Sequence, residues 1–381
     1  MGANRNVPVN ILVVNYRDRL HPAAGGAEKH LHRIFKRIVA MGHQVVLLTT
    51  MFKGAEKREV VDGIQVVRSG GDLFFQLTVA CAVRRLDKEF HFDVVYEDLN
   101  KLPLFTPKLL KKPVLVQMHH LWRKSIFAET VFPVALGVWA FERAIPLFYK
   151  KQPFVVVSPS TKKELVEIGV PENRVDIVYN GSDPVEMPCQ LPSEKPYFLW
   201  LSRVHRYKGI WVALQAFEIF AKKVPDVKLV VAGSGPLLPK LSSWLKARGL
   251  EDRVELAGFV TPQRKRELLA GAVALLQTSY KEGWGLTVVE AAQLDAPTIA
   301  SNVPGLKDSV KDGKTGILFP AGDAAACSAA MERVYSDETL RDTLAKAAKE
   351  YAMSFSWDDA AEQTVVLLEK TIAEYGKAGA R

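Results

Sequence analysis

Short runs of Val, Ile and Leu alternate along the whole chain with segments of helical periodicity. The first run covers residues 10–14, a glycine-containing loop follows it, and the next run covers 44–49. Between these runs, apolar residues recur at helical spacing: Leu31, Ile34, Phe35 and Ile38. Continuous apolar strands that alternate with amphipathic helices are typical of parallel sheets covered on both faces. The pattern therefore predicts an α/β protein built from β-α-β units.

The same pattern continues in two series, which a proline-rich break separates. The first series predicts strands at 94–96, 114–118, 154–157 and 175–179, and the second predicts strands at 197–201, 228–232, 254–256, 273–276 and 298–300. The break contains Pro184, Pro188, Pro192 and Pro196, a density that stops regular structure. We therefore expect two doubly wound, Rossmann-like domains facing a cleft, 1–183 and 197–356, joined by a linker at 184–196. Ligands are expected at the carboxyl ends of the strands.

Charge is distributed unevenly between the two halves. The composition, 48% hydrophobic and 24% charged, is that of a globular protein, and the net charge is +9. Residues 1–183 hold 26 Lys and Arg against 18 Asp and Glu, whereas 184–381 hold 25 against 24. Within the first half, residues 99–163 contain eleven basic and two acidic residues. This bias indicates either an anionic partner or ordinary solubility charge.

Residues 99–163 also combine aromatic side chains with the cations. The basic members are Lys101, Lys108, Lys111, Lys112, Arg123, Lys124, Lys150 and Lys151, and the aromatic members are Trp122, Phe127, Phe132, Trp139, Phe141, Phe148 and Tyr149. On one interpretation the N-terminal domain rests on the inner, anionic membrane surface. On the other, the rings pack in the core and the cations face water. One sequence does not separate these two interpretations, because it does not fix the faces of the helices.

Several classes of protein are excluded by what the sequence lacks. No segment has the roughly 20 apolar residues that cross a bilayer, and no apolar block precedes the first strand as in a signal peptide. We expect a cytoplasmic protein, peripheral at the membrane if the first interpretation holds, with no nucleic-acid partner. Cys81, Cys189 and Cys327 lie more than a hundred residues apart, which gives no disulfide framework, and we expect three buried thiols.

A glycine pair lies between the first strand and its helix. Gly25 and Gly26 permit close backbone approach, and free amides at the start of a helix hold anions. A phosphate site and a purely structural turn are both consistent with this pair.

A second strand-to-helix loop, in the C-terminal half, carries two cations. Arg203 follows the strand 197–201, and Lys208 precedes the next helix. A planar guanidinium and a point-charge ammonium suit a diphosphate and neutralise a leaving group without a metal. Two solvated surface cations are the alternative.

The segment 282–290 carries two carboxylates around a glycine-rich turn. Gly283 and Gly285 allow the backbone to pass close to a ligand, and a helix beginning near Leu286 presents its amides to phosphate. In this arrangement Glu282 accepts hydrogen bonds from sugar hydroxyls and Glu290 reaches a ribose. The alternative is that both are ordinary carboxylates near a helix terminus.

His119 is the candidate imidazole, because it follows the strand 114–118. A structural histidine is the alternative, and the sequence supplies no further ligands at zinc-site spacing. Asp-x-Asp, the usual carboxylate pair for a nucleotide-bound divalent ion, is also missing from the sequence. We therefore expect no metal and no cofactor.

Taken in order, the motifs of the chain resemble those of the retaining GT-B glycosyltransferases of family 4, over essentially the whole length. They are GGAE at 25–28, His119, VSPS at 157–160, YNGSD at 179–183, LSRVHRYKG at 201–209, VAGSGP at 231–236, EGWGLTVVE at 282–290 and TGILF at 315–319. The resemblance implies a UDP- or GDP-sugar donor held by the C-terminal domain and a lipid-linked or saccharide acceptor held by the N-terminal one. It also implies metal-independent hexosyl transfer with retention, and a last helix, 357–375, that crosses back to the first domain.

The resemblance further assigns roles to individual residues. Arg203 and Lys208 would bind the diphosphate, Glu282 the sugar hydroxyls, Glu290 the ribose, and His119 would lie beside the transferred sugar. Gly25 and Gly26 would close over the phosphates, and the amides of Leu286 and Thr287 would contact them. The remaining donor-site positions are Gly233, Gly283, Trp284 and Gly285. Asp308 stands where the family usually has Glu, Trp284 where it frequently has Phe, and Tyr179 where it frequently has Pro.

Other functions stay open. A GT-B-like sugar-nucleotide epimerase or phosphorylase, or a non-catalytic sugar-nucleotide-binding protein, would share the fold. A NAD-dependent oxidoreductase is suggested only by Gly233-Ser234-Gly235, because Leu238 occupies the place of the third glycine of that fingerprint.

Overall fold

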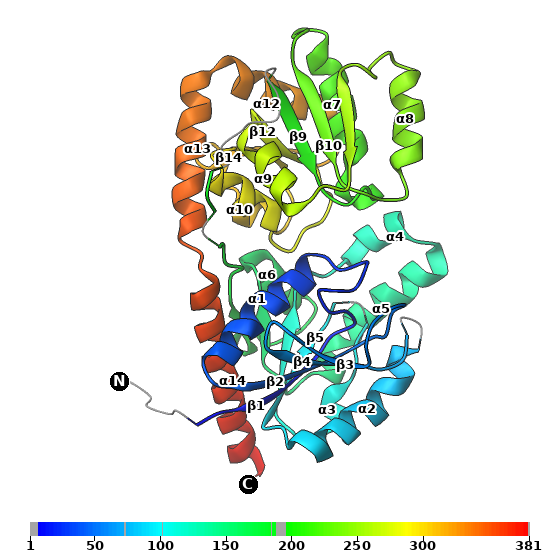
Figure 1. Ribbon diagram of the computed structural model, residues 1–381, viewed down its shortest axis with the longest axis vertical. Coiled ribbons are helices and arrows are strands. Elements are labelled where there is room, and N and C mark those ends of the chain that lie inside the picture. Colours follow the sequence, from blue (N-terminus) through cyan, green and yellow to red (C-terminus); the bar gives the residue numbers. More distant parts are fainter. Residues whose placement is uncertain (1–6, 72–73, 101, 184, 188–195, 380–381) are drawn as a thin grey trace. The chain divides into compact units, whose positions relative to one another are not determined.

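The computed structural model describes residues 7–71, 74–100, 102–183, 185–187 and 196–379. The chain divides into two compact units (Figure 1), of which the first contains Met1–Leu121, Gly137–Gly181 and Ser356–Arg381 and the second contains Trp122–Leu136 and Ser182–Phe355. The sequence placed 122–136 with the first domain, whereas here the segment belongs to the second unit, because it contacts the loop after the first strand of that unit. Of the expected linker, residues 184 and 188–195 lie outside the described part.

The first unit is built on a sheet with the order β3-β4-β2-β1-β5-β6-β7-β8. Its strands are β1 Asn10–Val14, β2 Gln44–Thr49, β3 Arg58–Val61, β4 Ile64–Arg68, β5 Val94–Asp98, β6 Val114–Met118, β7 Phe154–Val156 and β8 Val175–Ile177. All neighbours are parallel except β3 and β4, a hairpin that the sequence analysis missed. Its turn residues, Asp62 and Gly63, both have positive φ, as a type I′ hairpin turn requires.

Helices cover the first sheet. They are α1 Gly26–Ala40, α2 Phe75–Phe90, α3 Thr106–Leu109, α6 Pro159–Glu167, α14 Trp357–Gly379 and the part of α5 Phe132–Phe148 that lies in this unit. The expected last helix is thus confirmed and extends to Gly379. It packs beside α1 (Figure 1), where Arg37 donates to Asp358 at 2.5 Å.

The second unit is a fully parallel sheet with the order β11-β10-β9-β12-β13-β14. Its strands are β9 Tyr197–Leu201, β10 Lys228–Ala232, β11 Val254–Gly258, β12 Ala274–Gln277, β13 Thr298–Ser301 and β14 Gly316–Phe319. Its helices are α4 Ile126–Glu129, α7 Ile210–Ala221, α8 Leu238–Lys246, α9 Pro262–Ala270, α10 Leu286–Gln293, α11 Leu306–Ser309, α12 Ala324–Ser336 and α13 Glu338–Met353. The predicted α/β class with two parallel-sheet domains is confirmed.

Each sheet reverses its winding at one place. In the first, the chain leaves β1 toward β2 on one side and returns to β5 on the other, and in the second β9 lies between β10 and β12 in the same way. Crevices at such switch points, beyond the carboxyl ends of the strands, are where open α/β sheets bind ligands. The loops after β1 and β5, and those after β9 and β12, are therefore the places to look for function.

Two expectations about special segments can be compared with the structure. Within the described residues, no helix is long and apolar enough to cross a membrane. Cys327 is buried as expected, but Cys81 is exposed on α2, because its position on the helix faces away from the sheet. Cys189 lies outside the described residues.

Candidate functional site

The loop after β9 holds both predicted cations of the second unit. Arg203 is exposed, and its Nη2 donates to the hydroxyl of Tyr207 at 2.8 Å. Tyr207 and Lys208 lie in the short 3-10 turn Arg206–Lys208, and the Lys208 ammonium stands 5.0 Å from the centre of the Tyr207 ring. The Tyr207 ring also meets Trp122 edge to face at 5.2 Å. Tyr207, which the sequence analysis did not single out, thus holds the two cations on one loop.

Lys208 and Glu282 form an ion pair, although 74 positions separate them. The same Glu282 oxygen accepts from Ser279 at 3.0 Å. Burial by itself would lower the pKa of Lys208, but the Glu282 carboxylate outweighs it and holds that pKa above its ordinary value. The ammonium is therefore charged at neutral pH, beside the loop that follows β12.

The glycine-rich turn leads into α10 where the sequence predicted. Gly285 is the N-cap residue at φ 90°, and α10 begins at Leu286, so Leu286 and Thr287 supply amides that have no carbonyl partner within the helix. Gly283 is buried. The indole of Trp284 is 2% exposed and packs edge to face on Phe355 at 5.1 Å. Contacts from Trp284 to a ligand would therefore come from its backbone.

The two remaining positions of the predicted donor site lie apart from the Lys208 pair. Glu290 is on the second turn of α10, where it pairs with Lys265 of α9 at 2.9 Å. Gly233 follows β10 at φ 141°, and a Cβ there would lie 1.8 Å from the carbonyl oxygen of Ser202. The loop after β10 thus passes against the loop that carries Arg203.

In the first unit His119 lies directly after β6 and is largely buried. Its Nε2 is 3.2 Å from Oδ2 of Asp98, the last residue of β5, and its ring meets His30 of α1 edge to face at 4.8 Å. Burial by itself would lower the pKa of His119, but Asp98, and Glu28 beyond it, raise that pKa above its ordinary value. His30 is the opposite case, because burial, with the neighbouring His119, lowers its pKa to about 3.

The glycine pair lies at the start of α1. Gly25 is the N-cap residue, Gly26 is the first residue of the helix, and the Gly25 amide donates to Oε2 of Glu28 at 2.6 Å. The other oxygen of Glu28 accepts from Asn100 at 3.1 Å. Glu28 therefore connects the glycine loop with Asn100, in the segment that directly follows Asp98, the partner of His119. Burial raises the pKa of the Glu28 carboxyl.

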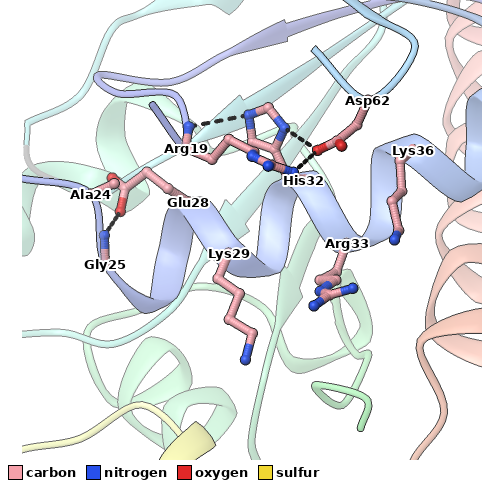
Figure 2. A pocket seen from close by; sticks show the side chains of 9 residues that line it. All are labelled: Arg19, Ala24, Gly25, Glu28, Lys29, His32, Arg33, Lys36 and Asp62. Atoms are coloured by element: carbon pink, nitrogen blue, oxygen red, sulfur yellow. Dashed lines mark hydrogen bonds and ion pairs between the residues drawn. The ribbon is translucent and has the colours of Figure 1, made fainter. Parts of the chain in front are cut away.

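A pocket of about 320 Å³ opens along α1 beside Glu28. Figure 2 shows the residues that line it: Arg19, Ala24, Gly25, Glu28, Lys29, His32, Arg33, Lys36 and Asp62. The sequence analysis did not find this pocket. Lys29, Arg33 and Lys36 follow helical spacing, which was a readable signal, but the contribution of Arg19 and Asp62 depends on the tertiary fold.

The structure thus groups the predicted residues by unit. In the second unit, Arg203, Lys208 and Glu282 come together at the β9/β12 switch point, with the start of α10 nearby in the chain and Glu290 on a separate pair. In the first unit, His119 lies at the end of β6 and the glycine pair at the end of β1. Asp98, Glu28 and His30 were missed as site residues, because each depends on contacts between distant segments. Among the described residues no cluster of three or more His, Cys, Asp or Glu side chains is arranged to hold a metal ion.

Comparison with known proteins agrees with this architecture. Residues 24–186 match the glycosyltransferase family 4 domain, and residues 188–351 match the domain described as glycosyl transferases group 1. A D-inositol 3-phosphate glycosyltransferase of a Nocardioides species is 27% identical over 402 residues, covering 93% of this chain and 87% of the relative.

Solved structures show the same fold. Sucrose-phosphate synthase from Thermosynechococcus elongatus superposes with a TM-score of 0.80 at 20% identity, covering 96% of this chain and 100% of that one. HepE of Anabaena, in complex with UDP and glucose, gives 0.76 at 18% identity, covering 95% and 100%. With two consecutive family domains matched and the GT-B fold shared, the chain belongs to the GT-B glycosyltransferases of family 4.

Proposed function

We propose that this glycosyltransferase moves a hexose from a UDP- or GDP-sugar to an acceptor hydroxyl with retention of anomeric configuration and without a metal ion. The observation that carries the proposal is the pairing of Lys208 with Glu282 at the β9/β12 switch point, on the loop that also carries Arg203. A charged ammonium and a guanidinium there supply the positive charge that a departing diphosphate needs.

In the proposed reaction, the bond between the anomeric carbon and the diphosphate oxygen breaks, and its electron pair leaves with the nucleoside diphosphate. The acceptor oxygen bonds to the same face of the anomeric carbon, and its proton moves to a phosphate oxygen of the leaving group. Arg203, Lys208 and the amides of Leu286 and Thr287 hold the diphosphate. Glu282, oriented by Lys208 and Ser279, accepts hydrogen bonds from the sugar hydroxyls.

The remaining roles follow from the position of each side chain. Glu290 accepts from the ribose, and Gly25, Gly26 and Gly233 let the backbone approach the donor. His119 contacts the transferred sugar. Burial by itself would lower the pKa of His119, but Asp98 raises it, which favours the protonated imidazole as a hydrogen-bond donor to the sugar.

Release of nucleoside diphosphate from a panel of UDP- and GDP-sugars tests the proposal, with thermal shift as the binding readout. UDP-glucose leads the panel, because HepE, a protein of the same fold, was solved with UDP-glucose. The expected result is stabilisation by one donor base, turnover that survives EDTA, and an NMR product spectrum with the anomeric configuration of the donor. Loss of turnover on chelation, restored by magnesium or manganese, would contradict metal independence. Donor binding without any product would instead indicate a sugar-nucleotide-binding protein.

We further propose that the enzyme works at an anionic membrane surface, with α5 as the contact. Phe141 and Leu147, in the part of this helix that lies in the first unit, are exposed, Leu147 by 78%, and Lys150 and Lys151 directly after the helix are exposed as well. Apolar side chains flanked by cations complement an anionic leaflet. Tyr149 does not take part, because it is buried and donates to Glu97, and neither does Lys112, which donates to the carbonyl of Phe92. Lys101 lies outside the described residues.

Liposome co-sedimentation at two salt concentrations tests this surface. Binding is expected to require anionic lipid, to weaken with salt, and to fall in the variant Leu147→Ser with Lys150→Ser and Lys151→Ser. Leu77→Ser on α2 is the matched control, because Leu77 is 75% exposed but lies on another helix. Equal sedimentation with neutral and anionic vesicles at low salt would contradict the proposal.

A further inference from the structure

The pocket along α1 is lined mainly by cations. Arg19, Lys29, Arg33 and Lys36 carry positive charge, against two carboxyls, Glu28 and Asp62. Lys29, Arg33 and Lys36 come from successive turns of α1 and project to the same side of it (Figure 2). The fourth Lys or Arg of this helix, Arg37, pairs with Asp358 of α14 instead. The charge of the pocket is thus a feature of one face of the helix.

The back wall of the pocket is fixed by polar contacts around the buried imidazole of His32. The Nε2 atom of His32 accepts from the Arg19 amide at 3.3 Å, so its Nδ1 carries the proton and points to Oδ2 of Asp62 at 3.5 Å. The Arg19 guanidinium pairs with the same carboxylate. Burial lowers the pKa of His32 to about 4, so this imidazole is neutral at physiological pH. The positive charge of the pocket therefore comes from Lys and Arg alone.

Glu28 connects this pocket with the histidine site of the same unit. Its carboxylate lines the pocket and also accepts from Asn100, two positions after Asp98, the partner of His119. A molecule in the pocket would therefore be separated only by the Glu28 carboxylate from Asn100, which lies in the segment next to Asp98. The volume of about 320 Å³ is at the lower end of small-molecule sites and exceeds what a bare phosphate fills.

We propose that this pocket binds the phosphate of a phosphorylated polyol, as the part of the acceptor that positions its hydroxyl for transfer. The inference rests on the proposed glycosyl transfer and adds the class of acceptor. Arg33 and Lys36 supply the charge for the phosphate, Arg19 is oriented by Asp62, and Glu28 accepts from a polyol hydroxyl. Either a water-soluble phosphopolyol or the headgroup of a phospholipid presents this chemistry.

Calorimetric titration with glycerol 3-phosphate tests the pocket directly, with glycerol as the uncharged control. Saturating UDP or GDP, whichever the thermal-shift panel selects, fills the phosphate site of the second unit during the titration. Glycerol 3-phosphate is expected to bind and glycerol not to bind. Affinity is expected to fall tenfold or more in the variant Arg33→Gln with Lys36→Gln. The matched control is Arg84→Gln with Lys88→Gln, an equal loss of charge on the exposed face of α2 in the same unit.

Two further measurements distinguish a soluble phosphopolyol from a phospholipid headgroup, and a failure of the pocket proposal from a failure of the proposed function. Vesicles of phosphatidylinositol in phosphatidylcholine, compared with pure phosphatidylcholine, measure whether the headgroup competes with glycerol 3-phosphate. Donor hydrolysis measured without an acceptor is expected to be the same in the pocket variant as in the wild type. If the wild type itself does not hydrolyse the donor, that result counts against the proposed function and not against the pocket. The pocket proposal would be overturned if neither glycerol 3-phosphate nor the phosphatidylinositol vesicles bound. It would also be overturned if the α2 control variant lost as much affinity for glycerol 3-phosphate as the pocket variant.

Discussion

The two units use glycine differently in the loop that follows the central strand. In the second unit, Gly209 has φ 68°, and a Cβ there would lie 1.9 Å from the carbonyl oxygen of Thr278. In the first unit, Gly25 has φ −144°, and a Cβ would meet only Oε2 of Glu28, at an ordinary 3.7 Å. The fold therefore requires glycine at 209, whereas at 25 it tolerates a side chain.

Other glycines of the second unit repeat the pattern of Gly209. A Cβ on Gly233 would lie 1.8 Å from the Ser202 carbonyl oxygen, and one on Gly305 would lie 2.4 Å from that of Glu282. The loops that carry Arg203 and Glu282 are thus held backbone to backbone, which fixes the charged groups before any ligand binds. The space beside Gly25 is free of such contacts. The difference teaches that a glycine motif can serve either the fold or the ligand, and that only local geometry distinguishes the two.

The largest effect is expected for Gly209→Ala. Overlap with a backbone carbonyl adds to the strain of positive φ, so we expect a loss of more than about 4 kcal/mol of unfolding free energy, or no folded second unit. Gly249→Ala is the matched control, because Gly249 has φ 63° but nothing within 4 Å of its would-be Cβ. It should lose only about 1–2 kcal/mol. Urea denaturation measures both, and equal losses would show that overlap with Thr278 is unimportant.

Next in size is Arg203→Ala. Loss of one preorganised charge at the leaving group is expected to lower turnover by about a hundredfold. Circular dichroism is expected to be unchanged, because the Arg203 side chain is exposed and donates to the hydroxyl of Tyr207 on its own loop. Arg206→Ala, also exposed and on the same loop, should stay within about threefold of wild type, the change a surface substitution brings. Near-normal kinetics of Arg203→Ala would remove this residue from the mechanism.

A smaller effect is expected from acid, and it should be larger in the first unit, which holds the most deeply buried histidines, than in the second, where burial also lowers the pKa of His205. The pKa of His30 is lowered to about 3 and that of His32 to about 4, so below pH 6.5 the unfolded chain binds more protons than the folded one and stability falls. His119 acts in the opposite sense, because the stability it adds is present below pH 6.5 and is lost as pH rises through its raised pKa. The net loss between pH 7.5 and 5.5 should be about 1–3 kcal/mol.

Hydrogen exchange measured by mass spectrometry localises this loss. Because intrinsic amide exchange slows as the pH falls, the readout is the protection factor at each pH. Protection is expected to fall on acidification in β1, β6 and α1, with peptides from β9 and β12 serving as internal controls. An equal loss of protection across both units would contradict the assignment to the buried histidines.

The smallest change in stability is expected for Gly25→Ala, the counterpart of Gly209→Ala. Gly25 needs no positive φ and has room for a methyl group, so the unfolding free energy should stay within about 0.5 kcal/mol of wild type. The methyl group would nevertheless occupy space that the proposed donor approaches, so the KM of the donor should rise severalfold. A variant that is destabilised by several kcal/mol would show that Gly25 serves the fold after all.

Much of the architecture was readable from hydrophobic patterning. The strands expected at 10–14, 44–49, 114–118, 197–201 and 228–232 have those bounds in the structure, and the helix expected to begin near Leu286 begins there. The β3–β4 hairpin was missed, although Asp62-Gly63 is a common hairpin turn, because both strands are short and β3 is mostly exposed. The strand β14 was read only as part of a family motif.

The candidate site was predicted in its residue types and not in its contacts. Arg203, Lys208, Glu282 and His119 were named from their places after strands, which periodicity shows. Three contacts were not predicted, because each joins segments that lie at the ends of different strands: Lys208 with Glu282, Asp98 with His119, and Glu28 with Asn100. The burial of Trp284 against Phe355 was not predicted either, because the direction of a side chain depends on its neighbours in space.

The sequence by itself determined the class of fold, the order of its strands and helices, and the loops in which charged residues and glycines accumulate. Those features depend on residues close together in the chain, whose periodicity and backbone freedom act locally. The tertiary structure alone decided which glycines are indispensable, which charges pair, and that Arg19, Arg33 and Lys36 line one pocket. These outcomes depend on strand order at the β1/β5 and β9/β12 switch points, where segments far apart in sequence are brought within a few ångströms.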